Sequence, residues 1–465
     1  MATLAWNTQA HLEAWYGIMG MGATCHTLNP RLTAAQTGAM LRQSGARVLI
    51  VSGDLLPLAA EIRDHAPAVT EVLVIDGDAA DWQAHGERLT ISNLNPAATA
   101  TEGAVVWGDF DETSPSGLCF TSGTTGRPKG VTYTHRSSYL HTVRMLQADV
   151  LGITRMDTVL AAVPMFHANA WGLPFAAPAV GARLVLPGRQ TDGASLAKLI
   201  AAESVSVAVG VPTVWLGLVE HLETSGGELP SLQRILVGGA PMAPALMQRI
   251  ERVLGVTVQT SWGMTELSPS GTMSLPGDPE RTAFQSGRPA VGLDLLLTDA
   301  GGRALPVQRN VEGHLRVKGA AVVERYLGDH EAATDADGWF ATGDLARIDG
   351  SGNLVITGRA KDLIKSGGEW INPAEIEAIV GALPEVSLAA VIGRADSKWG
   401  ERPMLVVSIR MHQSITDEAL LAALRGRVAS WWIPDSIVRL DTMPMASTGK
   451  IDKLLLRKQY GGAGS

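Results

Sequence analysis

Short apolar runs rich in β-branched residues alternate with segments of helical periodicity along much of this 465-residue chain. Residues 47–52 (RVLIVS) and 71–76 (EVLVID) predict strands, and residues 55–65 between them predict a helix. Further strands are expected at residues 158–163, 183–186, 206–211 and 234–237, with helices at residues 194–203 and 213–224. Such alternation is typical of α/β layers built on largely parallel sheets.

The pattern changes beyond residue 293, where short strands broken by Gly and Pro predict an antiparallel or barrel-like subdomain up to residue 328. A Gly-containing joint, Ile356-Thr-Gly-Arg-Ala-Lys-Asp362, precedes a segment that predicts a small, mobile α+β domain. In that segment we expect helices at residues 373–383 and 416–431 and strands at residues 387–392 and 404–410. The expected division is therefore a large N-terminal domain with several subdomains (1–358) and a small C-terminal domain (359–465), with a hinge near Lys361.

The composition favours a compact globular protein, because 46% of the residues are hydrophobic and 18% are charged. The net charge of −8 is spread without long runs of one sign, so nothing indicates a nucleic-acid or membrane-surface partner. The longest stretch without charged residues, 158–182, contains Pro164, Pro174 and Pro178, which favours a buried core segment over an integral membrane helix. Two cysteines and no signal-peptide pattern predict a cytoplasmic protein.

Residues 121–130, TSGTTGRPKG, concentrate four hydroxyls, three glycines and one lysine in ten positions. Glycine lets backbone N–H groups turn toward an anion, and the lysine adds a full positive charge. The spacing differs from that of a Walker A loop, and a flexible surface linker is the alternative. The candidate phosphate-binding residues are Thr121, Ser122, Gly123, Thr124, Thr125, Gly126 and Lys129.

Residues 261–266, SWGMTE, place an aromatic ring, a hydroxyl and a carboxylate close together after an apolar run. Glu266 is a candidate ligand for Mg²⁺, which prefers oxygen, while Thr265 would reach a phosphate and Trp262 would stack on a base. An ordinary helix start with an exposed Glu266 is the alternative.

Other candidate residues occur singly along the chain. Gly239, Ala240 and Pro241 end a strand and would allow the close approach of a flat ring, unless they form a simple turn. Asp344 would accept both hydroxyls of a ribose, and Arg359 would contact a ribose or a phosphate. His167 in an apolar segment is either a ligand contact or a core histidine, and Lys450 in the string STGK is either catalytic or a surface lysine.

Taken together, these strings resemble the adenylate-forming superfamily, which contains acyl-CoA synthetases, luciferases and peptide-synthetase adenylation domains, and the resemblance runs from residue 3 to about residue 460. Residues 26–32, 164–174 and 362–371 are similar to the branch of medium- and long-chain fatty acyl-CoA ligases, which includes ligases for 3-methylthiopropionate-type acids. The resemblance implies that a carboxylic acid, Mg·ATP and CoA form acyl-CoA, AMP and pyrophosphate through an acyl-adenylate. An aryl acid, transfer to a carrier protein, and a non-catalytic nucleotide- or acyl-binding protein remain alternatives, and the branch allows a homodimer.

The resemblance also implies roles for individual residues. Loop 121–126 and Lys129 would hold the phosphates, and Glu266 with Thr121 would hold Mg²⁺. Gly239, Ala240 and Trp262 are expected to flank the adenine, and Asp344 and Arg359 are expected to hold the ribose. The ATP- or AMP-binding residues also include Pro241, Gly263 and Met264. The expected catalytic residues are Lys450, Thr265, Glu266 and His167. The acyl chain is expected to contact His167, Ala168, Trp171 and Gly239, and small residues including Gly172 and Gly210 would leave room for it. The residues expected along the nucleotide or CoA path are Lys361, Lys365, Gly367, Gly368 and Trp370.

Members of the superfamily carry several dozen residues before the segment that matches residues 3–7. We therefore expect a sheet edge or a core face beside this segment to be uncovered.

Overall fold

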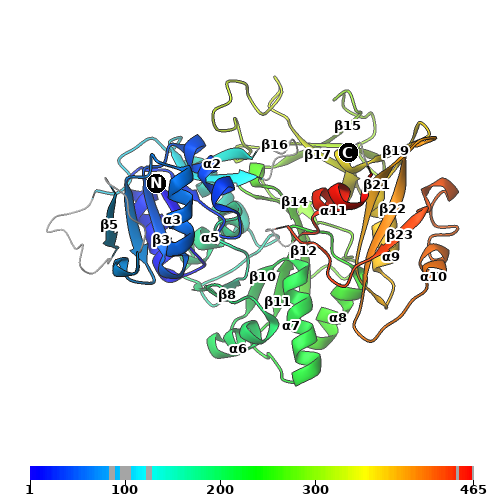
Figure 1. Cartoon of the computed structure of the whole chain (residues 1–465), viewed down its shortest axis with the longest axis horizontal. Coiled ribbons are helices and arrows are strands. Elements are labelled where there is room, and N and C mark those ends of the chain that lie inside the picture. Colours follow the sequence, from blue (N-terminus) through cyan, green and yellow to red (C-terminus); the bar gives the residue numbers. More distant parts are fainter. Residues whose placement is uncertain (83–88, 95–105, 122–127, 447–449, 463–465) are drawn as a thin grey trace.

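The computed structural model describes residues 1–82, 89–94, 106–121, 128–446 and 450–462. Two seven-stranded sheets form the large N-terminal part, a four-stranded sheet lies beside them, and a five-stranded sheet forms the small C-terminal domain. Figure 1 shows the first sheet at the left, the second at the bottom, and the C-terminal domain at the right. The predicted fold class, a large α/β part followed by a small C-terminal domain, is confirmed.

The first sheet has the strand order β5-β4-β3-β1-β2-β6-β7, and all its pairs are parallel except β6 with β7. Thr33 caps α2 in a capping box with Gln36, and Gly45 ends this helix in the left-handed conformation. The elements are β1 (Ala2–Leu4), α1 (Gln9–Gly20), β2 (Cys25–Thr27), α2 (Ala34–Ser44), β3 (Val48–Ser52), α3 (Leu56–His65), β4 (Glu71–Ile75), β5 (Thr90–Asn93), β6 (Pro115–Thr121), β7 (Lys129–Thr134) and α4 (His135–Met145).

The second sheet has the order β14-β13-β12-β11-β10-β8-β9, with parallel pairing from β9 to β12. Asn7 ties the two sheets together, because its side-chain amide donates to the carbonyls of Ala161 and Val163 and its oxygen accepts from the N–H of Met165. The elements are β8 (Thr158–Ala161), η3 (Ala168–Gly172), α5 (Leu173–Ala179), β9 (Arg183–Val185), α6 (Gly193–Glu203), β10 (Val207–Gly210), α7 (Pro212–Ser225), β11 (Arg234–Val237), α8 (Pro244–Leu254), β12 (Thr257–Gly263), η4 (Thr265–Leu267), β13 (Ser270–Met273) and β14 (Arg288–Pro289).

The third sheet is antiparallel in the order β15-β16-β17-β18, as predicted, and its described strands form an open sheet and not a closed barrel. The C-terminal sheet has the order β20-β19-β22-β21, with β23 parallel to β22. The elements are β15 (Asp294–Thr298), β16 (Glu312–Lys318), β17 (Phe340–Ile348), β18 (Leu354–Arg359), η5 (Ala360–Asp362), β19 (Ile364–Ser366), β20 (Glu369–Ile371), α9 (Pro373–Gly381), β21 (Val386–Asp396), β22 (Gly400–Ile409), α10 (Asp417–Ala422), η6 (Ser430–Trp432), β23 (Ser436–Arg439) and α11 (Lys453–Tyr460).

One predicted helix is shorter than expected. The prediction of a continuous helix over residues 416–431 is wrong, because α10 ends at Ala422 and Gly426 takes a positive φ of 73°. A left-handed glycine interrupts the helical backbone and turns the chain back, which places an isolated bridge between Arg425 and Val428.

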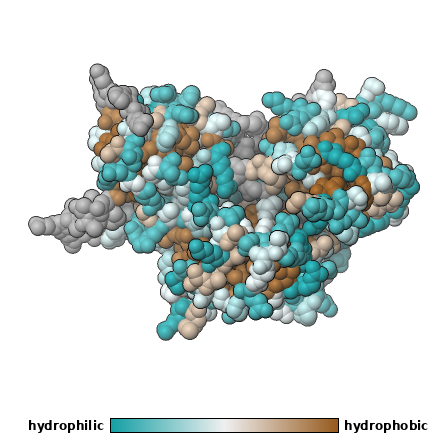
Figure 2. Space-filling model, turned by 60° about the horizontal axis from the view of Figure 1, so that its bottom comes forward, coloured by the Kyte–Doolittle hydropathy of each residue, from teal (hydrophilic) through white to brown (hydrophobic). Residues whose placement is uncertain are grey.

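The N-terminal strand β1 lies inside the first sheet, between β3 and β2. An apolar hollow of about 770 Å³ lies beside α1 and α4, lined among others by the exposed side chains of Tyr16, Trp107 and Tyr139. In Figure 2, hydrophobic patches interrupt the polar surface in the left and the right part of the view, and a notch separates these two parts at the top. Among the described residues, no helix is long and apolar enough to cross a membrane.

Candidate active site

The carboxyl ends of β11 and β12 lie at the same edge of the second sheet, because the two strands are parallel neighbours. Ligands in open α/β sheets bind at this edge. Gly239, Ala240 and Pro241 follow β11, Trp262 and Gly263 end β12, and Met264 and the turn η4 follow β12, so the predicted adenine contacts and the nucleotide residues beside them gather here.

Asp344 forms the polar centre of the site. It is 1% exposed, and one carboxylate oxygen accepts from the indole N–H of Trp262 at 2.9 Å. The other oxygen pairs with Nε of Arg359 at 2.6 Å, since Asp344 and Arg359 are directly opposite each other on β17 and β18. Burial raises the pKa of Asp344, and the charges of Arg359 and Lys450 with the Trp262 hydrogen bond oppose this shift.

Both oxygens of Asp344 thus already accept one bond each within the protein. A carboxylate has about four lone-pair directions. The predicted contact with two ribose hydroxyls therefore requires Asp344 to bind the sugar with its remaining acceptor capacity. The pairing with Arg359 and Trp262 holds the side chain in one orientation.

Lys450 of the C-terminal domain reaches this same site. Two contacts hold its backbone: Met445 and Ile451 form an antiparallel bridge, and the Ala446 N–H donates to the Lys450 carbonyl at 2.7 Å. A Cβ atom added to Gly239 would lie 3.9 Å from Cε of Lys450 and 3.4 Å from the ring of Trp171. The structure therefore brings residues 450, 239 and 171, which are far apart in the sequence, into one place.

The electrostatic environment of Lys450 is unusual for a lysine. Its surface is partly open to solvent, but the surrounding protein atoms lower its pKa by desolvation. The positive charges of Arg359 and Lys361 lower the pKa further, and the negative charge of Asp344 raises it. A negatively charged substrate would relieve this repulsion between cations, so the site favours an anion.

The predicted acyl side lies on a left-handed turn. Ala168, Asn169, Ala170 and Trp171 all have φ between 45° and 55°, and the four side chains are buried. Each such non-glycine residue costs on the order of 1 kcal/mol, and strain of this kind is concentrated at functional sites. Burial and the charge of Lys450 lower the pKa of His167 to about 4, so its imidazole is neutral at pH 7.

Two glycines that were expected to leave room for an acyl chain, Gly172 and Gly210, are packed against core side chains. An added Cβ at Gly210 would lie 2.8 Å from the ring of Trp215, and one at Gly172 would lie 2.5 Å from His141. These two glycines therefore make room for core side chains and not for an acyl chain. Gly238 is different, because the Trp171 ring itself fills the space beside it at 3.1 Å.

The structure describes the residues on either side of the predicted phosphate-binding loop. Thr121 ends β6 and is paired with Lys129 at the start of β7. The predicted residues Ser122, Gly123, Thr124, Thr125 and Gly126 lie outside the described residues. The Lys129 ammonium lies 4.7 Å from the ring centroid of Tyr326, whose hydroxyl donates to Glu266 Oε1 at 2.9 Å.

The predicted magnesium residues fit that ion chemically. Glu266 is 8% exposed and supplies a carboxylate, and Thr121 supplies a hydroxyl oxygen. Within the described parts of the chain, no three His, Cys, Asp or Glu side chains gather into a metal site. Mg²⁺ suits such a site, because it is usually bound by one or two carboxylates together with substrate phosphates.

The predicted nucleotide or CoA residues of the C-terminal domain lie on an edge hairpin. Lys365 of β19 is opposite Trp370 of β20, and its ammonium is 5.5 Å from the indole ring. Gly367 and Gly368, both with positive φ, form the turn, and the Trp399 ring lies directly over Gly367. In the strand order β20-β19-β22-β21 this hairpin forms one edge of the C-terminal sheet, and β19 joins the sheet through the pair Ser366 and Gly400.

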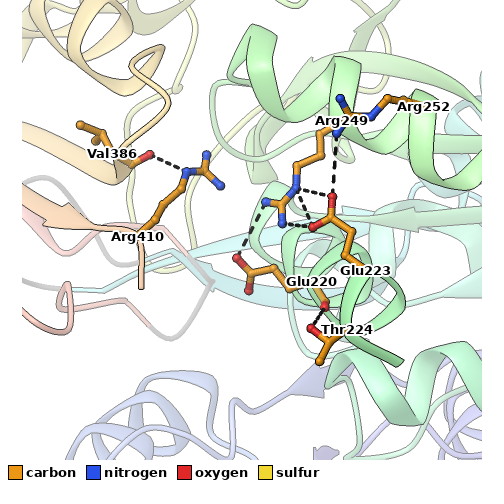
Figure 3. A network of polar contacts seen from close by, with 7 residues as sticks. All are labelled: Glu220, Glu223, Thr224, Arg249, Arg252, Val386 and Arg410. Carbon is orange, nitrogen blue, oxygen red and sulfur yellow. Dashed lines mark hydrogen bonds and ion pairs between the residues drawn. The ribbon is translucent and has the colours of Figure 1, made fainter. Parts of the chain in front are cut away.

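A polar network lies where the C-terminal domain faces α7 and α8. Arg249 of α8 binds Glu223 of α7, and Arg410, which follows β22, donates to the carbonyl of Val386 at 3.1 Å. The hydrogen bond from Arg249 lowers the pKa of Glu223, and the charges of Arg252 and Arg410 add to this shift. Figure 3 shows Arg410 across from Glu220 and Glu223.

The sequence prediction missed Tyr326 and Arg410 as residues of the site, and it did not single out Tyr133, which contacts the backbone next to Glu266. The Tyr133 hydroxyl donates to the Thr265 carbonyl at 2.9 Å, beside Glu266. No spacing rule connects Tyr326 with Glu266 or Tyr133 with Thr265, which are 60 and 132 positions apart. The only available signal was the position of Tyr133 immediately after the Gly-rich segment.

Comparisons with known proteins cover nearly the whole chain. The family model described as AMP-binding enzyme matches residues 1–327, and that described as AMP-binding enzyme C-terminal domain matches residues 375–450. A medium-chain-fatty-acid–CoA ligase of Ectopseudomonas oleovorans is 40% identical, over 99% of this chain and 86% of the relative. A 3-methylmercaptopropionyl-CoA ligase of Ruegeria lacuscaerulensis is 39% identical, over 100% of this chain and 87% of the relative.

Solved structures agree with these relatives. An anthranilate CoA ligase in complex with anthranoyl-AMP has a TM-score of 0.87 and 25% identity, covering 99% of this chain and 87% of that chain. An o-succinylbenzoate CoA synthetase of Bacillus subtilis, in complex with ATP and a magnesium ion, has a TM-score of 0.80 and 26% identity, covering 99% of this chain and 89% of that chain.

Proposed function

The chain belongs to the AMP-binding enzyme family, and we propose that it is an acid–CoA ligase that uses ATP and releases AMP and pyrophosphate. The observation that carries this proposal is the position of Lys450, which the C-terminal domain places beside Gly239, Trp171 and the Asp344–Arg359 pair. A lysine delivered by one domain to a site built by another suits a reaction in which negative charge develops at a phosphate.

In the first half-reaction, a carboxylate oxygen of the acid attacks the α-phosphorus of ATP, and pyrophosphate leaves. Lys450 would bridge the carboxylate and the α-phosphate, while Asp344 and Arg359 would hold the ribose. Lys129 would hold the outer phosphates. Glu266 and Thr121 would hold Mg²⁺, which would neutralise charge on those phosphates.

In the second half-reaction, the sulfur of CoA attacks the acyl carbonyl, and AMP leaves. We infer that Lys450 is not needed for that step, whereas the hairpin of Lys365, Gly367, Gly368 and Trp370, at the edge of the C-terminal sheet, carries the residues expected on the CoA path. We propose that the C-terminal domain turns about Lys361, so that Lys450 withdraws and this hairpin lines the CoA path. The same site thereby serves two chemistries.

The acid that we propose is a medium- or long-chain fatty acid. The support is the similarity to the Ectopseudomonas ligase and the position of the Trp171 ring over Gly238, where an indole would close one end of an acyl pocket. A 3-methylthiopropionate-type acid is the second candidate, because a relative of nearly equal identity is named for that substrate.

A panel of acids tests the proposal. Straight-chain acids from acetate to palmitate, a 3-methylthio acid and anthranilate would each be supplied with ATP and CoA, and thioester and AMP would be measured. We expect kcat/KM to rise about fourfold per methylene, from roughly 0.8 kcal/mol per buried CH₂, until the pocket is filled. A maximum at the methylthio or aromatic acid would contradict the fatty-acid assignment, and AMP formed with an acyl-adenylate but without CoA consumption would contradict the ligase itself.

The network of Arg410 gives a prediction about domain orientation. An Arg410→Glu substitution would place a negative charge opposite Glu220 and Glu223 and would destabilise the present orientation. We expect adenylation to slow by about threefold to tenfold, since exposed ion pairs are worth up to about 1 kcal/mol and the reversal adds repulsion. The rate of thioester formation from supplied acyl-adenylate should not fall.

Arg252→Glu is the matched control for this prediction. Arg252 also contacts Glu223, at 3.9 Å, but it lies on α8 of the large domain. Equal slowing by both substitutions would show that charge near α7 matters and domain orientation does not.

We further propose a cytoplasmic homodimer. The free, buried thiols of Cys25 and Cys119 support a reducing compartment, and the resemblance to the fatty acyl-CoA ligase branch supports the dimer. Among the rival functions, a non-catalytic binding protein is disfavoured because the named relatives are ligases.

A further inference from the structure

Tyr326 joins two parts of the phosphate side of the site that are distant in the sequence. Its backbone forms an isolated antiparallel bridge with Val131 of β7, and the next N–H, of Leu327, donates to the Gly130 carbonyl at 2.8 Å. Three residues earlier, the Val323 N–H donates to the Glu266 carbonyl at 2.7 Å. Residues 323–327 therefore bind both the start of β7 and the Glu266 turn.

The close approach of this segment depends on glycine. An added Cβ at Gly130 would lie 2.9 Å from Cβ of Leu327, which is shorter than a normal contact. The backbone of residues 323–327 thus lies directly on β7, and the position of Tyr326 follows from it.

The Tyr326 side chain makes two different interactions. Its hydroxyl donates to Glu266 Oε1 at 2.9 Å, and its ring lies 4.7 Å from the Lys129 ammonium. The first interaction holds one oxygen of a buried carboxylate, which fixes the direction of the other oxygen. The second holds the cation of Lys129, the first residue of β7, above an aromatic ring.

We propose that Tyr326 is a positioning residue that orients Glu266 toward Mg²⁺ and keeps Lys129 beside the outer phosphates of ATP. This inference rests on the proposed function, because it needs Mg·ATP as the ligand. The two interactions are separable, since phenylalanine keeps the ring and removes only the hydroxyl.

Calorimetry of ATP binding, with Mg²⁺ and with a chelator, tests the inference without relying on turnover. In Tyr326→Phe we expect the gain in ATP affinity that Mg²⁺ provides to shrink by about tenfold, because a hydrogen bond to a charged group is lost. Binding of metal-free ATP should change by less than about twofold, since the ring remains below Lys129. Tyr326→Leu should also weaken metal-free ATP, by about threefold.

Tyr133→Phe is the matched control. It removes a phenol that donates to the Thr265 carbonyl in the same turn, but it leaves the Glu266 carboxylate with its donor. We expect it to keep the magnesium-dependent gain within about twofold of the wild type. An equal loss in Tyr133→Phe and Tyr326→Phe, or an unchanged gain in Tyr326→Phe, would overturn the inference.

The thioester half-reaction gives a second readout. Supplied acyl-adenylate carries no β- or γ-phosphate, so Tyr326→Phe should form thioester from it at the wild-type rate. A loss in this step as large as the loss in the first step would overturn the positioning role.

A wild-type protein that does not bind ATP would contradict the proposed function itself. A wild-type protein that binds ATP without any gain from Mg²⁺ would overturn only this inference.

Discussion

Replacement of Lys450 by alanine is expected to slow acyl-adenylate formation by about 10²–10³-fold, the usual cost of removing one charge-stabilising donor from an active site. Lys450 lies beside Gly239 and Trp171, and it shares the site with Arg359, whose charge helps to lower its pKa. The alanine variant would leave the charge that develops between the carboxylate and the α-phosphate without this donor. Pyrophosphate release from acid and ATP measures the step.

The second half-reaction is the control for this substitution. Thioester formation from supplied acyl-adenylate and CoA should keep most of its rate in Lys450→Ala, because the proposed rotation of the C-terminal domain withdraws Lys450 before this step. Lys450→Arg should recover part of the first step, because it restores the charge but not the shape of the ammonium. Equal losses in both half-reactions would contradict the role assigned to Lys450.

Replacement of Lys361 by proline is expected to slow thioester formation by about 10²-fold while adenylation changes by less than about threefold. Lys361 is the central residue of η5 (Ala360–Asp362), between the third sheet and the C-terminal domain. Proline fixes φ at its own position and restricts the preceding residue, so the chain would lose the rotation that the second step needs. Asp362 pairs with Arg457 of α11 at 3.0 Å, which joins the hinge region to the helix that follows Lys450.

Lys361→Ala separates the backbone effect from the charge effect. Lys361 contributes to the lowered pKa of Lys450, so loss of its charge alone alters the site. Alanine removes the charge but keeps a rotatable backbone, and it should leave thioester formation within about threefold of the wild type. If the alanine and proline variants slow the second step equally, Lys361 does not act as a hinge.

Much of the fold could be predicted from the sequence because its strands are continuous apolar runs. Residues 234–237 and 71–76 are examples, and they form β11 (Arg234–Val237) and β4 (Glu71–Ile75). The helix expected over residues 416–431 failed for a local reason, because α10 ends at Ala422 and the left-handed Gly426 keeps the chain from continuing as a helix, which the apolar pattern did not reveal.

The residues of the site could be predicted where a short sequence motif contains the charged, aromatic or hydroxyl side chains that the chemistry needs. The structure places Trp262, Asp344, Arg359 and Lys450 together, although their individual roles toward ATP stay predictions. The space around glycine was not predictable, because whether Trp215 or an acyl chain occupies the room at Gly210 depends on tertiary packing. Tyr326 could not be found for the same reason, since its partners Glu266 and Lys129 meet it only in the folded chain.

The transfer of oxygen-18 from acid to AMP tests the acyl-adenylate route most directly. The acid would be labelled at both carboxylate oxygens and supplied with ATP and CoA, and the AMP would be analysed by mass spectrometry. Attack of the carboxylate on the α-phosphorus, followed by thiol attack on the acyl carbonyl, leaves one labelled oxygen on each AMP formed, matched by one acyl-CoA. Unlabelled AMP, or label that appears only in inorganic phosphate with ADP, would contradict the proposed function.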